Sequence, residues 1–135
     1  MSINGGNKVV DACEKYWAAY QSDCSGFVKA VARELGVVLT GQANDIVNQI
    51  KSATWVPVRS GDDAAAKAGI GLVVAGLADN PHGHVVIVVP GRPAYGKYPT
   101  AYWGQLNGVG RKKTTLNFAW NKVDRDKVSY SWHSL

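Results

Sequence analysis

The sequence has few cysteines and histidines and no long apolar run. Its two cysteines, Cys13 and Cys24, can form one disulfide at most, so their number says little about the redox compartment. No apolar stretch reaches the length of a membrane-spanning helix, which indicates a soluble protein without membrane insertion. Residues 1–17 lack the basic region, apolar region and small-residue cleavage site of a secretory signal. If the protein acts outside the cell that makes it, another system must export it.

Length and composition indicate one globular domain. The chain of 135 residues is long enough for one sizeable core and too short for two, and it shows neither an internal repeat nor a linker. We therefore expect a single domain over residues 1–135. Fifteen basic and ten acidic residues give a formal charge of +5. This excess suits an anionic surface such as cell wall or nucleic acid, and a solubilising surface explains it equally well.

Residues 22–36 are the most informative stretch, because they predict a helix that begins beside a cysteine. Ser22 or Asp23 can cap the helix, apolar residues then recur at helical spacing, and Gly36 ends it. Cys24 therefore falls in the first turn, where unpaired amide groups and the positive end of the helix dipole favour an anion. We expect its thiol to ionise more easily than that of a free cysteine.

The two cysteines have different neighbours. Cys24 is followed by the small residues Ser25 and Gly26, which leave its sulfur accessible. Cys13 lies on an apolar helical stripe within residues 9–20, where a small buried hydrophobic residue belongs. We therefore interpret Cys13 as a core residue and Cys24 as the candidate nucleophile.

The rest of the chain predicts helices first and strands afterwards. Further helical patterns cover residues 8–20, 42–50 and 60–68. Strands are expected at residues 55–58 (an edge or connecting segment), 70–77, 84–89, 101–106, 116–120 and 128–132. A turn-forming stretch separates 70–77 from 84–89, so these two should pair antiparallel. The order indicates an α+β fold in which the helices pack on one side of an antiparallel β-sheet.

A histidine is the usual base for a cysteine nucleophile, and it can come from a distant part of the chain. His84 begins an apolar strand directly after Gly83, where its side chain can point from the sheet end toward a helix terminus. His82 lies in the preceding turn and His133 near the C-terminus, so we expect both to be exposed and incidental. His84 is therefore the candidate base.

These motifs resemble those of a known family. The strings DCSGFV and GHVVIVV resemble the cysteine and histidine motifs of NlpC/P60 peptidases, in which a cysteine helix precedes a histidine strand in a papain-like core. Along nearly the whole chain, strings such as DCSGFVKAVARELGV, GQANDIV, KYPTAYWG and WNKVDRDKVSYSW are similar to small peptidoglycan amidase effectors of the bacterial type VI secretion system. The resemblance implies that Cys24 is the nucleophile and His84 the base.

The resemblance also implies a substrate, partners and a place of action. Such effectors cut the peptide stems of the cell wall in rival bacteria, at the bond between D-glutamate and meso-diaminopimelate. A member would be made in the cytoplasm, delivered by the type VI apparatus and active in the periplasm of the target cell. Its producer would need a periplasmic immunity protein, and no cofactor or nucleic acid is implied. An N-acetylmuramoyl-L-alanine amidase that uses the same two residues is the alternative activity.

The family's third polar residue orients the histidine from the next strand, and here that segment carries no carboxylate. Either the Gln105 amide or a backbone carbonyl near Trp103 could hold the imidazole, and we favour the carbonyl. The backbone N–H of Cys24 would supply one donor of an oxyanion hole. The sequence does not identify a second donor.

Other interpretations of the same residues remain open. His82 and His84 with a cysteine could bind zinc, but a second pair of ligands is missing and we expect no metal. Aromatic residues near lysines, as in AYGKYPTAYW, could stack on sugars or bases, which would make the protein a non-catalytic binder of wall glycan or nucleic acid. Gln42 and Asn44 could either face the catalytic cleft or cap the third helix.

Overall fold

The computed structural model describes residues 5–135, so the first four residues of the expected domain lie outside the described part. Its α-helices are α1 (Gly5–Tyr16), α2 (Cys24–Glu34), α3 (Ala43–Gln49) and α4 (Gly61–Lys67). Its strands are β1 (Val56–Val58), β2 (Leu72–Leu77), β3 (His84–Val88), β4 (Thr100–Trp103), β5 (Arg111–Thr115) and β6 (Ser129–His133). Two short 3₁₀ helices are η1 (Ala18–Tyr20) and η2 (Leu116–Phe118). No described helix is long and apolar enough to cross a membrane.

The strands form one sheet in the order β1-β6-β2-β3-β4-β5, and every neighbouring pair is antiparallel. The predicted pairing of residues 70–77 with 84–89 is confirmed as β2 and β3, with Leu77 opposite His84. Pro57 lies in β1 at the sheet edge, as a strand residue without an N–H group should. The α+β class and the antiparallel sheet are therefore confirmed.

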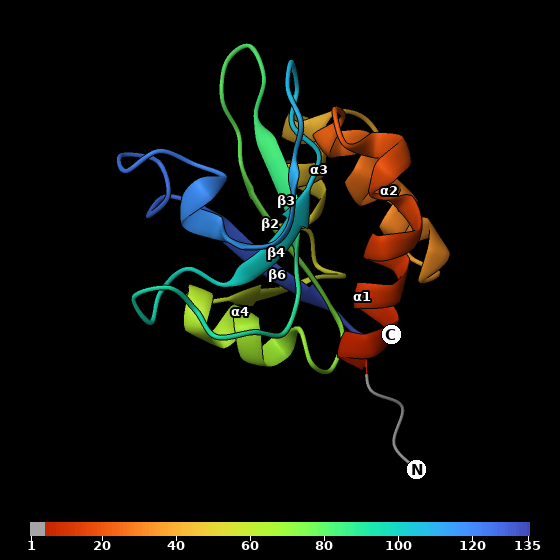
Figure 1. The fold of residues 1–135 in the computed structure, drawn as a ribbon. Helices are drawn as coiled ribbons and strands as arrows, with labels where there is room; N and C mark the ends of the chain where they lie inside the picture. The colour runs from red at the N-terminus through yellow and green to blue at the C-terminus, as the bar shows by residue number, and fades with distance from the viewer. Residues whose placement is uncertain (1–4) are drawn as a thin grey trace.

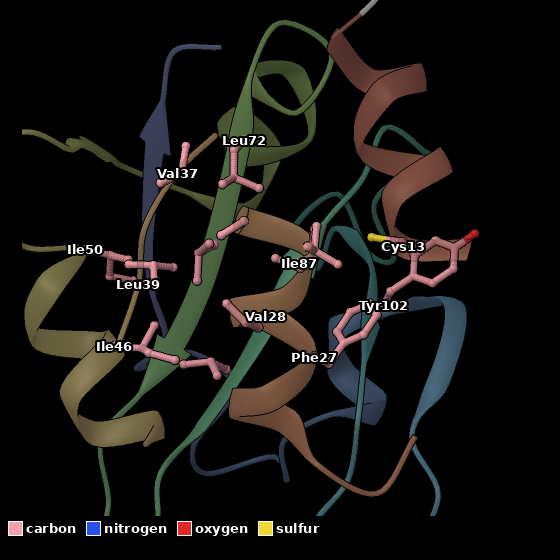
Figure 2. Packing of buried hydrophobic residues seen from close by; sticks show 14 of the residues in the cluster. Cys13, Phe27, Val28, Val37, Leu39, Ile46, Ile50, Leu72, Ile87 and Tyr102 are labelled. Carbon is pink, nitrogen blue, oxygen red and sulfur yellow. The ribbon is translucent and has the colours of Figure 1, made fainter. Parts of the chain in front are cut away.

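The two faces of the sheet are covered by different helices (Figure 1). Alternate residues of β3 divide between them: Val85 and Ile87 face α1 to α3, and Val86 and Val88 face the side of α4. Figure 2 shows the first of these clusters, where Phe27 and Tyr102 pack close to α1. The prediction that all helices lie on one side is thus right for the three N-terminal helices and wrong for α4.

The sequence missed one strand, and one predicted strand is wrong. β5 was not predicted, because its sequence RKKTT lacks apolar residues and its strand structure depends on pairing with β4. The segment 116–120, predicted as a strand, instead begins with η2. Only Leu116 of this segment is fully buried, whereas Phe118 is 62% exposed, so no face of a strand is formed.

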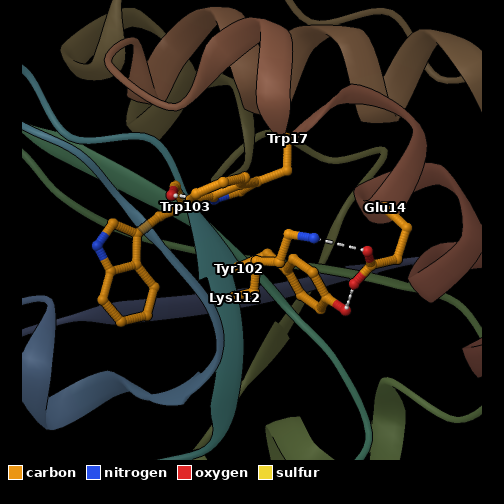
Figure 3. A network of polar contacts seen from close by, with 5 residues as sticks. All are labelled: Glu14, Trp17, Tyr102, Trp103 and Lys112. Carbon is orange, nitrogen blue, oxygen red and sulfur yellow. Dashed lines mark hydrogen bonds and ion pairs between the residues drawn. The ribbon is translucent and has the colours of Figure 1, made fainter.

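A polar network attaches α1 to the end of the sheet beside α2 (Figure 3). The Glu14 carboxylate accepts hydrogen bonds from the Tyr102 hydroxyl and from Lys112, the latter at 2.9 Å. These two bonds lower the pKa of Glu14, and burial together with the Glu14 contact raises the pKa of Tyr102. The Trp17 indole N–H donates to the Trp103 carbonyl at 3.1 Å. Glu14 therefore connects α1 to both β4 and β5, and Trp17, which directly follows α1, adds a second contact to β4.

Candidate active site

The start of α2 has the capped geometry that its sequence predicts. Asp23 is the N-cap, and its carboxylate accepts the Gly26 N–H at 2.9 Å. Of the two capping candidates, Asp23 rather than Ser22 therefore fills the role. Gly36, with φ of +82°, follows the last turn, as predicted for the helix end. Cys24 is thus the first residue of α2, and it is 9% exposed.

Both cysteines are free thiols. Cys13 is completely buried among the residues of the first cluster, and burial raises its pKa well above the ordinary value. Its predicted core position is confirmed. Cys24, by contrast, lines a cavity.

This cavity has a volume of about 70 Å³ and lies where α2, α3 and the loop 78–83 meet. Its lining residues are Asp23, Cys24, Ser25, Gln42, Ala43, Asn44, Pro81, His82, Gly83 and Leu106. The Ser25 hydroxyl connects two walls, because it contacts the Asp23 carboxylate at 3.3 Å and the Gln42 side-chain oxygen at 3.2 Å. Substrate can therefore approach the sulfur between the first turn of α2 and the loop that leads into β3.

The expectation that Cys24 ionises more easily than a free cysteine is wrong. Burial raises the pKa of the thiol, and the Asp23 carboxylate adds to the increase. The backbone amides of Val85, Ser25 and Cys24 act in the opposite direction, as predicted for a helix start, but desolvation is the larger effect. The influence of the Val85 amide places the sulfur beside the peptide group that links Val85 to His84.

His84 is held by aromatic rings rather than by a polar group. Its ring centroid lies 5.0 Å from that of Trp120 and 6.5 Å from that of Trp103, both in edge-type geometry. Its Nε2 atom is buried and has no hydrogen-bond partner within residues 5–135. Burial lowers the pKa of His84 to about 4, so the imidazole is neutral at pH 7.

The structure brings the sulfur to the His84 main chain but does not join the two side chains. Val85 faces the helix that carries Cys24, and the alternation of β3 turns His84 toward the tryptophans. Burial alone accounts for the shifted pKa of His84, with no contribution from the thiol. Within the described residues, no hydrogen bond joins the Cys24 thiol to the buried Nε2 atom of His84.

The two candidates for orienting His84 have other contacts. The Trp103 carbonyl accepts the Trp17 indole N–H at 3.1 Å, whereas the Gln105 contact with the Gln21 carbonyl, also at 3.1 Å, is made by its backbone N–H and not by the side-chain amide suggested above. The contact of Trp103 with His84 that the structure shows is made by its ring. An orienting role for either residue stays a prediction.

Gln42 and Asn44 combine the two roles that the sequence left open. Both line the cavity, and Gln42 also forms a capping box with Asp45, whose carboxylate accepts the Gln42 N–H at 2.9 Å. The Asn44 side chain donates to the Asp79 carbonyl at 2.8 Å and accepts the Asp79 N–H at 3.1 Å. Asn44 therefore fixes the loop 78–83 that forms the opposite wall.

Sequence reasoning missed two cavity residues. His82 is exposed, as predicted, but it lines the Cys24 cavity, so its position is not incidental. Leu106 also lines the cavity, and it is 48% exposed. The sequence places it at the end of the strand predicted over residues 101–106, whereas β4 ends at Trp103 and leaves Leu106 in the following loop. His133 lies elsewhere, packed against Trp55 at 5.0 Å between ring centroids.

The residues suggested for zinc are not assembled. Within the described chain, no group of three histidine, cysteine, aspartate or glutamate side chains is close enough to hold a metal ion. His82 borders the cavity while His84 packs against Trp103 and Trp120, so the two rings do not form one ligand set.

Comparison with known proteins identifies a relative. No protein-family model matches the chain. The chain is 37% identical over 139 aligned residues to the peptidoglycan amidase Tse1 of Pseudomonas aeruginosa, and the alignment covers 94% of this chain and 90% of that protein. Such similarity over nearly the full length of both proteins shows common descent. The chain therefore belongs to the family of the peptidoglycan amidase Tse1.

Proposed function

We propose that this protein is a peptidoglycan amidase that hydrolyses the bond between D-glutamate and meso-diaminopimelate, with Cys24 as nucleophile and His84 as base. The observation that carries the proposal is the position of Cys24 at the N-terminus of α2 and in a cavity, in a chain related over 94% of its length to a peptidoglycan amidase. The selection of this particular bond rests on the resemblance to type VI amidase effectors.

The two neutral groups define how the reaction would start. The raised pKa of Cys24 and the lowered pKa of His84 favour thiol and imidazole over a preformed ion pair. In the proposed step, the imidazole takes the thiol proton as the sulfur attacks the amide carbonyl of the stem. Hydrogen bonds between catalytic groups are often incomplete without substrate, so the unpaired Nε2 atom of His84 is compatible with this role.

The first turn of α2 would stabilise the negative charge that forms on the carbonyl oxygen. Its N–H groups at Cys24 and Ser25 have no partner within the helix because no earlier turn supplies carbonyls, and the Asp23 cap satisfies the N–H of Gly26 instead. Collapse of the intermediate breaks the C–N bond, and the diaminopimelate nitrogen receives the proton from His84. Water then hydrolyses the thioester, which yields a free carboxylate and regenerates the thiol.

Delivery and protection form part of the same proposal. We infer export by a type VI apparatus, action in the periplasm of a target bacterium, and inhibition by a periplasmic immunity protein that covers the Cys24 cavity. The support is the similarity of the motifs to such effectors. A protein with a periplasmic signal should lyse a Gram-negative host, whereas the cytoplasmic form should not. Lysis by the cytoplasmic form alone would count against a wall substrate.

Mass spectrometry of digested Gram-negative sacculi tests the bond. The proposal expects muramyl dipeptides ending in D-glutamate, together with fragments that carry a new diaminopimelate amine. Digestion in ¹⁸O water should place the label on the γ-carboxyl of D-glutamate. Release of intact stems from lactate would instead identify an N-acetylmuramoyl-L-alanine amidase.

Variants of the two cysteines test the nucleophile. Cys24→Ala should abolish hydrolysis and keep the fold, because it removes the covalent route. Cys13→Ala should keep activity and lose on the order of 1 kcal/mol of stability, as for removal of a small buried side chain. If the Cys24→Ala protein binds sacculi as before and the parent cuts nothing, the protein is a non-catalytic binder.

Variants of the three histidines test the base. His84→Ala should be as inactive as Cys24→Ala, whereas His133→Ala and His82→Ala should retain most activity. Equal inactivation by His82→Ala and His84→Ala, with stoichiometric zinc in the purified protein, would favour a metal centre instead.

A further inference from the structure

A second cavity lies on the opposite face of the sheet from Cys24. It has a volume of about 220 Å³, and it is lined by the start of α4, the loop before β4 and the segment that leads into β6. Its floor includes the rings of Tyr98 and Tyr130, which belong to the cluster on the α4 side, whereas Cys24 belongs to the cluster under α1 to α3. The two cavities are therefore separated by the sheet.

Three cationic side chains line this cavity: Arg59, Lys97 and Arg125. None of them forms an ion pair within 4.0 Å in the part of the chain that the structure describes. Asp62 and Asp126 are the acidic residues of the lining, so its formal charge is +1 (three cations and two anions). Asp126 already accepts the Tyr98 hydroxyl at 2.7 Å.

Arg125 contributes an unpaired buried donor to the lining of this cavity. Its guanidinium stacks on the Tyr98 ring, 4.6 Å from the centroid, which fixes its orientation. Its Nε atom is nevertheless buried, and it has no hydrogen-bond partner in residues 5–135. A buried donor of this kind is costly unless a ligand or water satisfies it. Carboxylates suit an arginine held in this way, because the planar guanidinium can bind both oxygens.

The Tyr130 hydroxyl adds a neutral donor at the same place. Tyr130 is 9% exposed, and burial, with the nearby Tyr98 and Asp126, raises its pKa well above the ordinary value. The group therefore stays protonated and can donate. Arg59 and Lys97 are exposed at the rim, where they can attract an anion from solution.

We propose that this cavity, lined by Arg59, Lys97, Arg125 and Tyr130, binds a carboxylate of a peptidoglycan stem other than the one being cut. The inference rests on the proposed function, since the wall is a polymer whose stems carry several carboxylates. Because the sheet separates the cavity from Cys24, the bound group must belong to a neighbouring stem. Such a contact keeps the enzyme on the polymer between successive cuts.

Co-sedimentation with sacculi tests the proposal in the Cys24→Ala protein, which cannot digest its ligand. The double variant Arg59→Gln/Lys97→Gln removes two exposed cations from the rim and should weaken binding at least threefold. Arg125→Gln should weaken it further. The matched control is Lys8→Gln/Arg33→Gln, which removes the same charge from exposed positions on α1 and α2 and should bind as the parent does. Circular dichroism and thermal melting confirm that each variant is folded.

A second co-sedimentation measurement uses sacculi whose carboxyl groups have been amidated, so that they can no longer act as anionic ligands. Amidation should abolish the difference in sacculus binding between the parent and Arg59→Gln/Lys97→Gln. If Lys8→Gln/Arg33→Gln weakens binding as much as Arg59→Gln/Lys97→Gln does, the loss follows from net charge alone and the proposal is overturned. A difference that appears only on phosphatidylglycerol vesicles would assign the cavity to lipid phosphate, which also overturns it. These outcomes do not depend on hydrolysis, so failure of the proposed amidase activity is recorded separately by the muropeptide analysis.

Discussion

The His84 imidazole lies with its ring centroid 5.0 Å from the Trp120 indole, and their planes are inclined by 64°. The Trp120 and Trp103 rings both pack against His84. The buried Nε2 atom of His84 has no polar partner in the described residues. A catalytic histidine is usually held by a hydrogen bond to its second nitrogen. The contacts of the His84 ring are instead with the aromatic rings of Trp103 and Trp120.

Trp120 should therefore position His84, and its substitution should change the pH dependence of the reaction. Trp120→Ala admits water to the imidazole, so the pKa of His84 should rise from about 4 toward 6.5. The acid limb of kcat/KM should move upward with it, and kcat should fall at least tenfold with little change in KM. Trp120→Phe keeps an aromatic edge and should restore most of kcat.

Trp55→Ala is the matched control, because Trp55 packs in the same edge geometry against His133, at 5.0 Å and 70°. It should lower stability without moving the acid limb. If the two alanine variants change the pH profile equally, or if neither does, Trp120 has no positioning role.

The half-buried, neutral His84 should also make the protein less stable in acid. The pKa of His84 is about 4 in the folded state and 6.5 for the unperturbed side chain. The unfolded chain therefore gains a proton first as the pH falls below 6.5, and stability is lost progressively until about pH 4. The loss should be on the order of 2 to 3 kcal/mol. Urea denaturation at pH 7 and pH 4 measures it.

Substitution of the histidine isolates this contribution from the carboxylates that titrate in the same range. His84→Gln should lose less stability than the parent between pH 7 and pH 4, whereas His133→Gln should follow the parent. An identical acid loss in the parent and His84→Gln would show that His84 is not a buried neutral base.

Thiol alkylation should report the environment of Cys24. In the Cys13→Ala protein, the rate of reaction with iodoacetamide should rise with pH, with a midpoint above that of an ordinary thiol. The physical reason is burial, which outweighs the amides of Val85 and Ser25. Addition of His84→Gln should change this profile little, since burial is the main cause of the raised pKa of the thiol. A midpoint well below the ordinary range would indicate a preformed thiolate and imidazolium pair.

The cysteine helix was predictable from sequence because its determinants are local. An Asp23 cap, apolar residues at helical spacing and Gly36 act within a few turns, and they specify both the helix and the position of Cys24 in its first turn. The division between Cys13 as core and Cys24 as cavity residue followed from the same periodicity.

The direction of the His84 ring and the ionisation of Cys24 depend on contacts distant in sequence. The ring direction follows from the register of β3 with β2, and its neighbour Trp120 comes from a segment predicted as a strand. Burial of Cys24 depends on α3 and the loop 78–83 closing over α2. The strand β5 was missed for a related reason, because RKKTT is extended only through its pairing with β4.

Asn44 should control the wall of the active-site cavity through its two hydrogen bonds to Asp79. Those bonds hold the loop 78–83, which contributes His82 and Gly83 to the cavity and leads directly into His84. Asn44→Leu removes both bonds and should lower kcat/KM at least tenfold. Asn44→Asp replaces the donor with a carboxylate oxygen that faces the Asp79 carbonyl, and its effect should be smaller and greatest above the carboxyl pKa.

Hydrogen exchange at the Asp79 amide distinguishes a loosened loop from a general loss of stability. Exchange at this amide should accelerate in Asn44→Leu, which removes its acceptor, and less in Asn44→Asp, which keeps an acceptor oxygen, while amides in the core of β2 remain protected. Asn48→Asp introduces the same charge on the exposed side of α3 and should alter neither exchange nor activity. If the Asp79 amide exchanges faster in Asn44→Leu but kcat/KM stays normal, the loop does not need to be fixed for hydrolysis, and Asn44 serves the fold alone.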